Sequence, residues 1–193
     1  MRNTLRRRLW HLASGLGIAL AAWFLPDTIL LVSLGVITFL FLAFEILRLN
    51  IPRINNWFFS RFGSLLRDRE RASVTTSSYV LIAALIGYLL FGREIAVLSV
   101  CFLAVGDVAA GIVGSWIGRT RLFGKALEGD LACFFACLAA GFILHYCAGV
   151  HVGLVPILVG SVAATVGQAI RNPAVDDNLT LPLLAGVAMA AMP

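Results

Sequence analysis

The segment 106–130 concentrates residue types that could bind a polyphosphate together with a metal ion. Asp107 is followed at helical spacing by three glycines, Gly111, Gly114 and Gly118. On a helix these four positions share one face, so a carboxylate would stand beside exposed backbone. An acidic side chain inside an apolar membrane segment is costly and is a functional candidate by default. We therefore interpret Asp107 and its glycine face as part of a binding site.

Charged residues follow this helix and recur near the carboxyl end of the chain. The first group comprises Arg119, Arg121, Lys125, Glu128, Gly129 and Asp130, and the second comprises Asp176, Asp177 and Asn178. Mg²⁺ prefers oxygen ligands, usually one or two carboxylates together with substrate phosphates. Arginine and lysine side chains and exposed glycine backbone suit the phosphates themselves. Together with Asp107, the two groups predict a site for Mg²⁺ and phosphate.

The composition places these residues in a membrane protein. Of the 193 residues, 60% are hydrophobic and only 13% are charged, and the mean hydropathy is +0.94. A soluble domain of this length would need a more polar outer surface. The long, continuous apolar runs predict an all-α, polytopic bundle of transmembrane helices, and the length suits one integral membrane domain over residues 1–193.

The net charge of +5 comes from arginine, since Lys125 is the only lysine. In a membrane protein such residues indicate topology and contact with anionic lipids, and no nucleic-acid-binding motif accompanies them. The four cysteines lie in apolar runs without a CxxC pair. We therefore interpret them as buried small apolar residues.

Hydropathy divides the chain into about seven transmembrane helices. We expect them at residues 9–25, 28–49, 77–91, from 95 into the glycine face, 131–148, 154–170 and 179–192, with a tight turn at 92–94. The last segment is short for a span of ~20 residues, so its end need only reach the far interface. A signal peptide is the alternative for the first segment, but His11, Ser14 and Gly15 interrupt its apolar run early.

A polar stretch, residues 50–75, separates the second and third of these helices. Arginines are interleaved there with phenylalanines and a tryptophan, which predicts an amphipathic helix at the membrane interface. A plain cytosolic loop is the alternative. Glu45 and Arg48 precede this stretch and are three residues apart on a helix, so their side chains can pair.

The basic residues predict the orientation of the bundle. With the N-terminus in the cytosol and one crossing per helix, Arg93 is the only one of the 15 basic residues on the outer side. Cytosolic loops of membrane proteins carry the excess of arginine and lysine. The distribution therefore favours seven spans over six or eight. It also puts Asp107 on the inner half of its helix and turns the candidate site toward the cytosol.

Each candidate residue also has an explanation that involves no chemistry. The glycine face could be a small-residue packing seam between helices. The Asp176–Asn178 turn could cap the last helix. His11 could be an interfacial histidine bonded to backbone, and Lys125 could be one more cytosolic charge. The occurrence of all of them on one membrane face favours a site.

Four sequence elements resemble the CTP-dependent lipid-alcohol kinases, the family of dolichol kinase, phytol kinase and the yeast-type diacylglycerol kinase. They are residues 7–11 (RRLWH) with Gly15, residues 106–110 (GDVAA) with Gly114 and Gly118, residues 125–129 (KALEG), and residues 176–182 (DDNLTLP). The resemblance covers most of the chain. This sequence has Ala126 where serine or threonine is usual and Asp130 where a small hydroxyl residue is usual. It also lacks the extra spans of dolichol kinase.

The resemblance implies a membrane kinase that transfers the γ-phosphoryl group of CTP to the hydroxyl of a lipid alcohol. The reaction would take place at the cytosolic face of a cell inner membrane or an endoplasmic-reticulum-type membrane. The implied partners are CTP, Mg²⁺, membrane lipids and the acceptor, which could be a polyprenol such as dolichol, a phytol-like isoprenol or diacylglycerol.

The implied site residues fall into three overlapping sets. The expected catalytic residues are Asp107, Lys125, Glu128 and Asp177. The expected metal ligands are Asp107, Asp177 and Asp176. The expected nucleotide-binding residues are Arg7, His11, Gly111, Gly114, Gly118, Arg119, Arg121, Lys125, Gly129 and Asn178. Lys125 would neutralise the phosphates together with Arg119 or Arg121, and Glu128 would orient the lysine or assist the attacking hydroxyl.

Two other functions stay open on the sequence. A cytidylyltransferase that makes a CDP-lipid would share CTP, Mg²⁺ and a membrane site, but the Pro-Gly-His-Gly-Gly run of that family is absent. A transporter that uses Asp107 to carry a proton or cation would need a path to both faces. The only acids expected on the outer side are Asp27 and Glu94. The sequence leaves open the lipid alcohol, the strictness for CTP and the oligomeric state.

Overall fold

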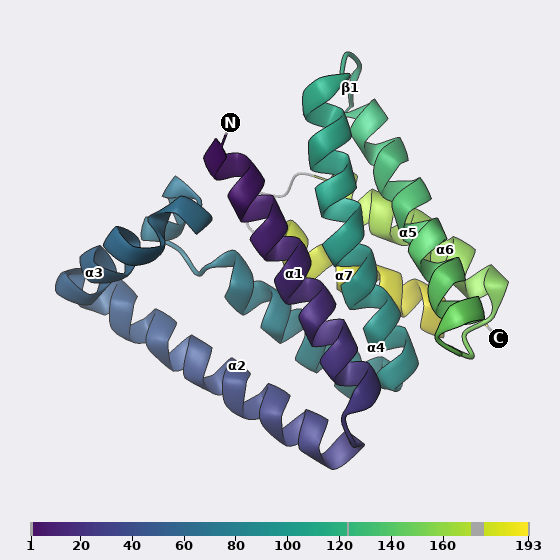
Figure 1. The fold of residues 1–193 in the computed structure, drawn as a ribbon, viewed down its shortest axis with the longest axis horizontal. Helices are drawn as coiled ribbons and strands as arrows, with labels where there is room; N and C mark the ends of the chain where they lie inside the picture. Colours follow the sequence, from purple (N-terminus) through teal and green to yellow (C-terminus); the bar gives the residue numbers. More distant parts are fainter. Residues whose placement is uncertain (1, 123, 171–175, 193) are drawn as a thin grey trace.

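The computed structural model describes residues 2–122, 124–170 and 176–192, which form a helical bundle (Figure 1). The α-helices are α1 (Arg2–Phe24), α2 (Asp27–Asn50), α3 (Pro52–Phe62), α4 (Thr76–Trp116), α5 (Leu127–Cys147), α6 (Leu154–Ala169) and α7 (Asp177–Ala190). Two short 3₁₀ turns, η1 (Gly63–Leu65) and η2 (Asp68–Arg71), precede α4. A two-stranded antiparallel hairpin, β1 (Arg121–Leu122) and β2 (Lys125–Ala126), precedes α5. The all-α prediction is confirmed; Arg171, part of the predicted charge distribution, lies outside the described residues.

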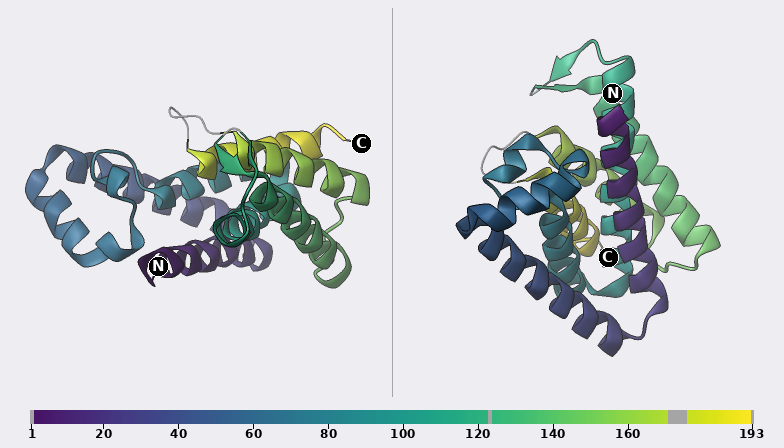
Figure 2. Two further views of the ribbon diagram at one scale, coloured as in Figure 1. Left: turned by 90° about the horizontal axis from the view of Figure 1, so that it is seen from above. Right: turned by 60° about the vertical axis from the view of Figure 1, so that its left-hand side comes forward.

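The longest helix, α4, is bent at Gly92, where φ is 78° and ψ is 178°. Glycine adopts positive φ without the steric penalty of other residues, so the bend falls at this position. The two halves of α4 correspond to the helices predicted at 77–91 and from 95 onward. α2 and α3 lie toward one side of the bundle and α5 and α6 toward the other, with α4 in contact with both groups (Figure 1, Figure 2). The core accordingly includes Leu98 and Phe102 of α4, both 0% exposed.

Within the residues that the structure describes, three helices, α2, α4 and α5, are long and apolar enough to cross a membrane. α6 and α7 are apolar but shorter. Large apolar side chains stand on the outer surfaces of the helices, for example Phe39, Phe135 and Ile143, which are 70%, 63% and 61% exposed. Such surfaces are unfavourable in water and suit a hydrocarbon environment. The fold is therefore that of a membrane protein, while the count of seven spans stays a prediction.

The polar stretch 50–75 forms α3, η1 and η2 rather than one continuous helix, and buried Arg48 holds it against the bundle. The Arg48 guanidinium pairs with the Glu45 carboxylate, as predicted. It also donates hydrogen bonds to the carbonyl oxygens of Glu70 (2.9 Å) and Ser73 (2.7 Å). This network ties the segment between α3 and α4 to the end of α2.

We expect Arg48→Ala to lower the free energy of unfolding by about 3–5 kcal/mol, because it leaves the Glu45 carboxylate buried without its cation. Thermal unfolding of the purified protein in detergent should show a lower midpoint. Arg53→Ala is the matched control, since Arg53 is exposed on α3, and it should change the midpoint little. Equal midpoints for the two variants would contradict the anchoring role of Arg48.

The turn between α1 and α2 is tied to the bend in α4 by Arg93. Its guanidinium donates hydrogen bonds to Asp27 Oδ1 (2.6 Å) and to the carbonyl oxygens of Trp23 (3.0 Å) and Leu25 (2.7 Å). The N-terminus and the β1–β2 hairpin lie toward the opposite end of the bundle (Figure 1). This arrangement is compatible with the predicted orientation, in which Arg93 lies on the outer side and the hairpin in the cytosol.

Cysteine labelling tests this orientation. In a Cys147→Ser background, we expect Asn56→Cys and Thr120→Cys to react with a membrane-impermeant thiol reagent only from the cytosolic side, because α3 and the loop before β1 are predicted to be cytosolic. Both positions are exposed. The unaltered protein is the complementary control, since its exposed Cys147 at the end of α5 should react from outside. Outside labelling at Asn56→Cys or Thr120→Cys would overturn the orientation.

Candidate active site

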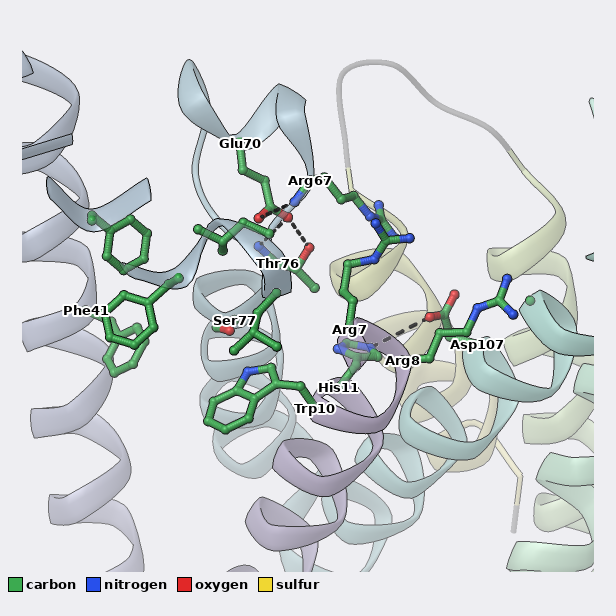
Figure 3. Close-up of a pocket in the computed structure, with 15 residues that line it drawn as sticks. Arg7, Arg8, Trp10, His11, Phe41, Arg67, Glu70, Thr76, Ser77 and Asp107 are labelled. Atoms are coloured by element: carbon green, nitrogen blue, oxygen red, sulfur yellow. Dashed lines mark hydrogen bonds and ion pairs between the residues drawn. The ribbon is translucent and has the colours of Figure 1, made fainter. Parts of the chain in front are cut away.

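A cavity of ≈ 340 Å³ lies between α1, α2, the segment that joins α2 to α4, and residues from both halves of α4 (Figure 3). Its polar wall carries Arg7, Arg8 and His11 from α1, Arg67 from the residues before η2, Glu70 from η2, and Thr76, Ser77 and Asp107 from α4. Three guanidinium groups therefore face one cavity, which suits the binding of phosphate groups. The residues predicted from the sequence that the cavity brings together are Arg7, His11, Asp107 and Gly111.

His11 and Asp107 meet where α1 packs on α4. His11 is buried, and its Nε2 lies 3.9 Å from Asp107 Oδ2. Among the described residues, this nitrogen has no hydrogen-bond partner. A ring nitrogen and a carboxylate oxygen thus face each other beside the cavity, where they could exchange a proton with a ligand or bind it.

Gly111 makes room for one of the arginines. A Cβ at this position would stand 3.1 Å from Nε of Arg8, so the guanidinium lies against bare helix backbone. Burial and the neighbouring Arg67 cation lower the pKa of Arg7 from its usual value, since both disfavour a further positive charge. A bound anion would relieve this crowding of positive charge.

Gln168, near the end of α6, links the two acids that the sequence predicts to work together. Its Nε2 donates to Asp107 Oδ1 (3.3 Å), and its backbone carbonyl accepts a hydrogen bond from Lys125 Nζ. Lys125 Nζ also donates to Asp177 Oδ2 at 3.1 Å. These four residues form one continuous polar cluster. Sequence reasoning missed Gln168, although a polar amide in an otherwise apolar helix is a usable signal.

Asp177 connects the polar cluster to the cavity. Arg67, which lines the cavity, places Nη1 4.0 Å from Asp177 Oδ1, and Asn178 Nδ2 donates to the same oxygen at 3.2 Å. Asp176 instead accepts a hydrogen bond from the backbone N–H of Asn178 at 3.1 Å and pairs with Arg69 at 2.6 Å. The capping alternative therefore describes Asp176, the N-cap of α7, while Asp177 faces the candidate site.

The other glycines predicted to bind nucleotide pack α4 against the hairpin and α5. A Cβ on Gly118 would stand 2.6 Å from the Cβ of Ala126, and one on Gly129 would stand 3.3 Å from Cα of Gly114. A Cβ on Gly114 would lie 3.4 Å from Ala126. The packing-seam alternative therefore describes these three glycines, because neighbouring atoms fill the space beside them. Gly111 alone of the predicted glycines lines the cavity.

Glu128 closes the loop after α4 instead of orienting the lysine. Its Oε1 accepts hydrogen bonds from the backbone N–H groups of Arg119 and Thr120, both at 3.1 Å, while Lys125 is bonded to α6 and α7. Arg119 and Arg121 are exposed and do not line the cavity. A role for these two arginines at the phosphates stays a prediction that the cavity geometry does not support.

The metal-binding prediction rests on few protein ligands. No group of three His, Cys, Asp or Glu side chains in the described ranges is arranged to hold a metal ion. Asp107 and Asp177 belong to one polar cluster, and Oδ2 of Asp107 faces His11 beside the cavity. Mg²⁺ is usually bound by one or two carboxylates plus water and substrate phosphates. A Mg²⁺ site at Asp107 and Asp177 therefore stays a prediction, because Lys125 and Arg67 pair with the Asp177 carboxylate in this structure.

The fold and this site define a class: a helical membrane protein with an arginine-lined cavity beside a polar cluster that contains two acids and a lysine. One protein with a stated function is similar to this chain at low sequence identity. The chain is 26% identical over 170 residues to CTP-dependent diacylglycerol kinase 1 of Eremothecium gossypii, a match that covers 77% of this chain and 54% of the kinase. The chain therefore spans about half the length of that relative.

A second similarity extends over nearly the whole chain. The uncharacterized protein RP860 of Rickettsia prowazekii is 23% identical over 182 residues, which cover 92% of this chain and 89% of that protein. No protein-family profile matches the chain, and no solved structure matches it significantly. The similarity to the diacylglycerol kinase is distant and is consistent with kinase activity.

Proposed function

We propose that this protein is a membrane kinase that transfers the γ-phosphoryl group of CTP to the hydroxyl group of a lipid alcohol. The observation that carries the proposal is the convergence of three arginines, His11 and Asp107 on one cavity, next to the Lys125–Asp177 pair. The distant similarity to a CTP-dependent diacylglycerol kinase supports the donor and the class of acceptor. Diacylglycerol, polyprenols and phytol-like isoprenols are the candidate acceptors.

Phosphoryl transfer needs positioning and charge neutralisation more than covalent chemistry from the protein. The guanidinium groups of the cavity would bind the phosphates of the nucleotide. Lys125, which is paired with Asp177 in this structure, would add its compact ammonium charge at a phosphate oxygen. Asp107 and Asp177 would hold the Mg²⁺ that offsets the negative charge of the phosphates.

The acceptor hydroxyl would be deprotonated beside His11 and Asp107. Its oxygen forms a bond to the γ-phosphorus as the bond from that phosphorus to the bridging oxygen breaks, so the products are a lipid phosphate and CDP. The hydroxyl proton would pass to Nε2 of His11, which has no other hydrogen-bond partner in the described ranges. The Asp107 carboxylate would stabilise the imidazolium that forms.

The proposal includes the topology. The helices α1, α2, α5, α6 and α7 and the two halves of α4 would make seven spans, with the N-terminus and the candidate site at the cytosolic face. This arrangement brings the cavity to the side where CTP is present. The membrane would be a cell inner membrane or an endoplasmic-reticulum-type membrane.

The test is an assay of purified protein with CTP labelled separately in the α- and γ-phosphates, across a panel of lipid alcohols. A kinase puts the γ label into lipid and releases CDP. A cytidylyltransferase puts the α label into lipid and releases pyrophosphate, and a transporter puts neither label into lipid. Failure to transfer the γ label to any alcohol of the panel would overturn the proposal.

A further inference from the structure

The part of the cavity that lies away from its arginines has no role in the proposed phosphate binding. Away from the arginines its wall is aromatic, with Trp10 from α1, Phe41 from α2, and Phe58 and Phe62 from α3. Figure 3 shows the side chains of Phe41 and Asp107 toward opposite sides of the cavity. The cavity is therefore amphipathic along its length, cationic at one side and aromatic at the other.

The aromatic half reaches the outer surface of the bundle. Three of its side chains are about half exposed: Trp10 at 54%, Phe62 at 44% and Phe41 at 42%. Phe41 precedes Asn50, the last residue of α2, by nine positions. At the helical rise Phe41 is therefore ~14 Å from the end of α2. In a helix that spans the membrane, a residue at that position lies at hydrocarbon depth.

The helices that border this opening are held apart. α1 and α2 share a turn that Arg93 ties to α4, and from there they diverge (Figure 1). α1 packs on α4, while α2 packs on α3 and α4. At the other end η1 contacts α1, and its Leu65 lines the cavity. The opening between α1 and α2 therefore faces sideways, toward lipid.

We infer that the aromatic half of the cavity binds the hydrocarbon chain of the lipid acceptor, which enters between α1 and α2. This inference rests on the proposed kinase function. The hydroxyl at the end of such a chain would lie toward His11 and Asp107, the residues at the polar side of the same cavity. Burial of a chain against aromatic side chains is favourable and needs no polar partner.

The cytosine ring of the nucleotide is the competing occupant. Its amino and carbonyl groups would meet phenylalanines, Leu65 and Leu66. The polar groups available beside them are the indole N–H of Trp10 and the hydroxyl of Ser77, too few for the polar atoms of the ring (Figure 3). Polar atoms buried without hydrogen-bond partners cost free energy. The chemistry of this half therefore favours an aliphatic chain over a base.

Photolabelling tests the site directly. The protein is reconstituted in phosphatidylcholine vesicles with either a diacylglycerol or a long-chain prenol that carries a diazirine in its hydrocarbon chain, and the labelled residues are mapped by mass spectrometry. We expect label on Trp10, Phe41 or Phe62 that excess unlabelled lipid alcohol reduces at least threefold. Competed label confined to other helices, such as the exposed Phe135 of α5, would overturn the inference.

A pair of variants on one helix sharpens the test. Phe41→Trp narrows the opening, whereas Phe39→Trp changes a 70% exposed residue of α2 outside the cavity. We expect Phe41→Trp to reduce the competed label at least threefold and to raise KM for the lipid alcohol, with KM for CTP unchanged. Phe39→Trp should change neither. A raised KM for CTP with unchanged lipid KM in Phe41→Trp would assign this half to the nucleotide.

The photolabelling tests the lipid site and the kinase assay tests the reaction, so failure of one proposal can be told from failure of the other. Labelling requires no phosphoryl transfer, so competed label at the cavity in a protein without kinase activity would overturn the proposed reaction and leave a lipid-binding site. Kinase activity with no competed label at these residues would instead overturn the lipid site and leave the reaction standing.

Discussion

Replacement of Asp107 by asparagine should lower the turnover of the proposed kinase by ~10²-fold or more, the size of effect seen when one electrostatic stabilising group is lost. Asparagine keeps the size of the side chain, and its oxygen can still accept the hydrogen bond from Gln168 Nε2. The variant loses the charge that would hold Mg²⁺ and stabilise protonated His11. We expect a loss of similar size in Asp177→Asn, since that carboxylate pairs with Lys125.

Initial rates with γ-labelled CTP at several Mg²⁺ concentrations measure both effects. The Mg²⁺ requirement of Asp107→Asn should also rise, which a purely structural role would not produce. Asp68→Asn is the matched control, because Asp68 is an exposed acid of η2 that does not line the cavity, and it should stay near full activity. Near-normal turnover in Asp107→Asn would overturn the metal-ligand role, and a lowered thermal midpoint in the same variant would assign the carboxylate to helix packing.

Lys125 should show the second large effect: Lys125→Arg loses roughly tenfold or more in turnover and Lys125→Ala ~10²-fold or more. The ammonium group lies between the backbone carbonyl of Gln168 and Asp177 Oδ2. A guanidinium is wider and planar, so it fits badly where a compact charge is held by two acceptors. Both variants should keep their expression and orientation. Lys125→Arg retains a basic residue in the loop predicted to be cytosolic, and in Lys125→Ala many other basic residues remain on that side.

Arg121→Lys is the control for charge in the same hairpin. Arg121 is exposed and does not line the cavity, so this exchange should change turnover less than twofold, roughly the scale of ordinary surface substitutions. Full activity in Lys125→Arg would show that Lys125 acts as one more topological charge. That result would remove the lysine from the proposed phosphate site without affecting the lipid site.

Much of the candidate site could be predicted because its residues break local patterns. Asp107 is an acid in an apolar helix, and Lys125 is the only lysine in a chain that otherwise uses arginine. Such exceptions can be read from one segment at a time. Arg8 and Arg67 could not be found in this way, because an arginine in a basic segment looks ordinary until its contacts are known.

For the glycines, the sequence predicts the shared helix face but not the role of each residue. Helical spacing correctly predicts that Gly111 and Gly114 share a face with Asp107, but spacing does not say what fills the space beside them. In the structure Arg8 lies beside Gly111, whereas Ala126 lies beside Gly114. One glycine therefore belongs to the cavity and the other to a packing seam.

Hydropathy and helical spacing by themselves determined the helical membrane class, the positions of most helices and the presence of an acid among glycines, because these properties depend on neighbouring residues along the chain. The tertiary structure alone decided that α6 brings Gln168 between Asp107 and Lys125, and that the segment after α3 carries Arg67 to Asp177. Those contacts join residues far apart in sequence. They depend on how complementary helix surfaces pack, which no local pattern encodes.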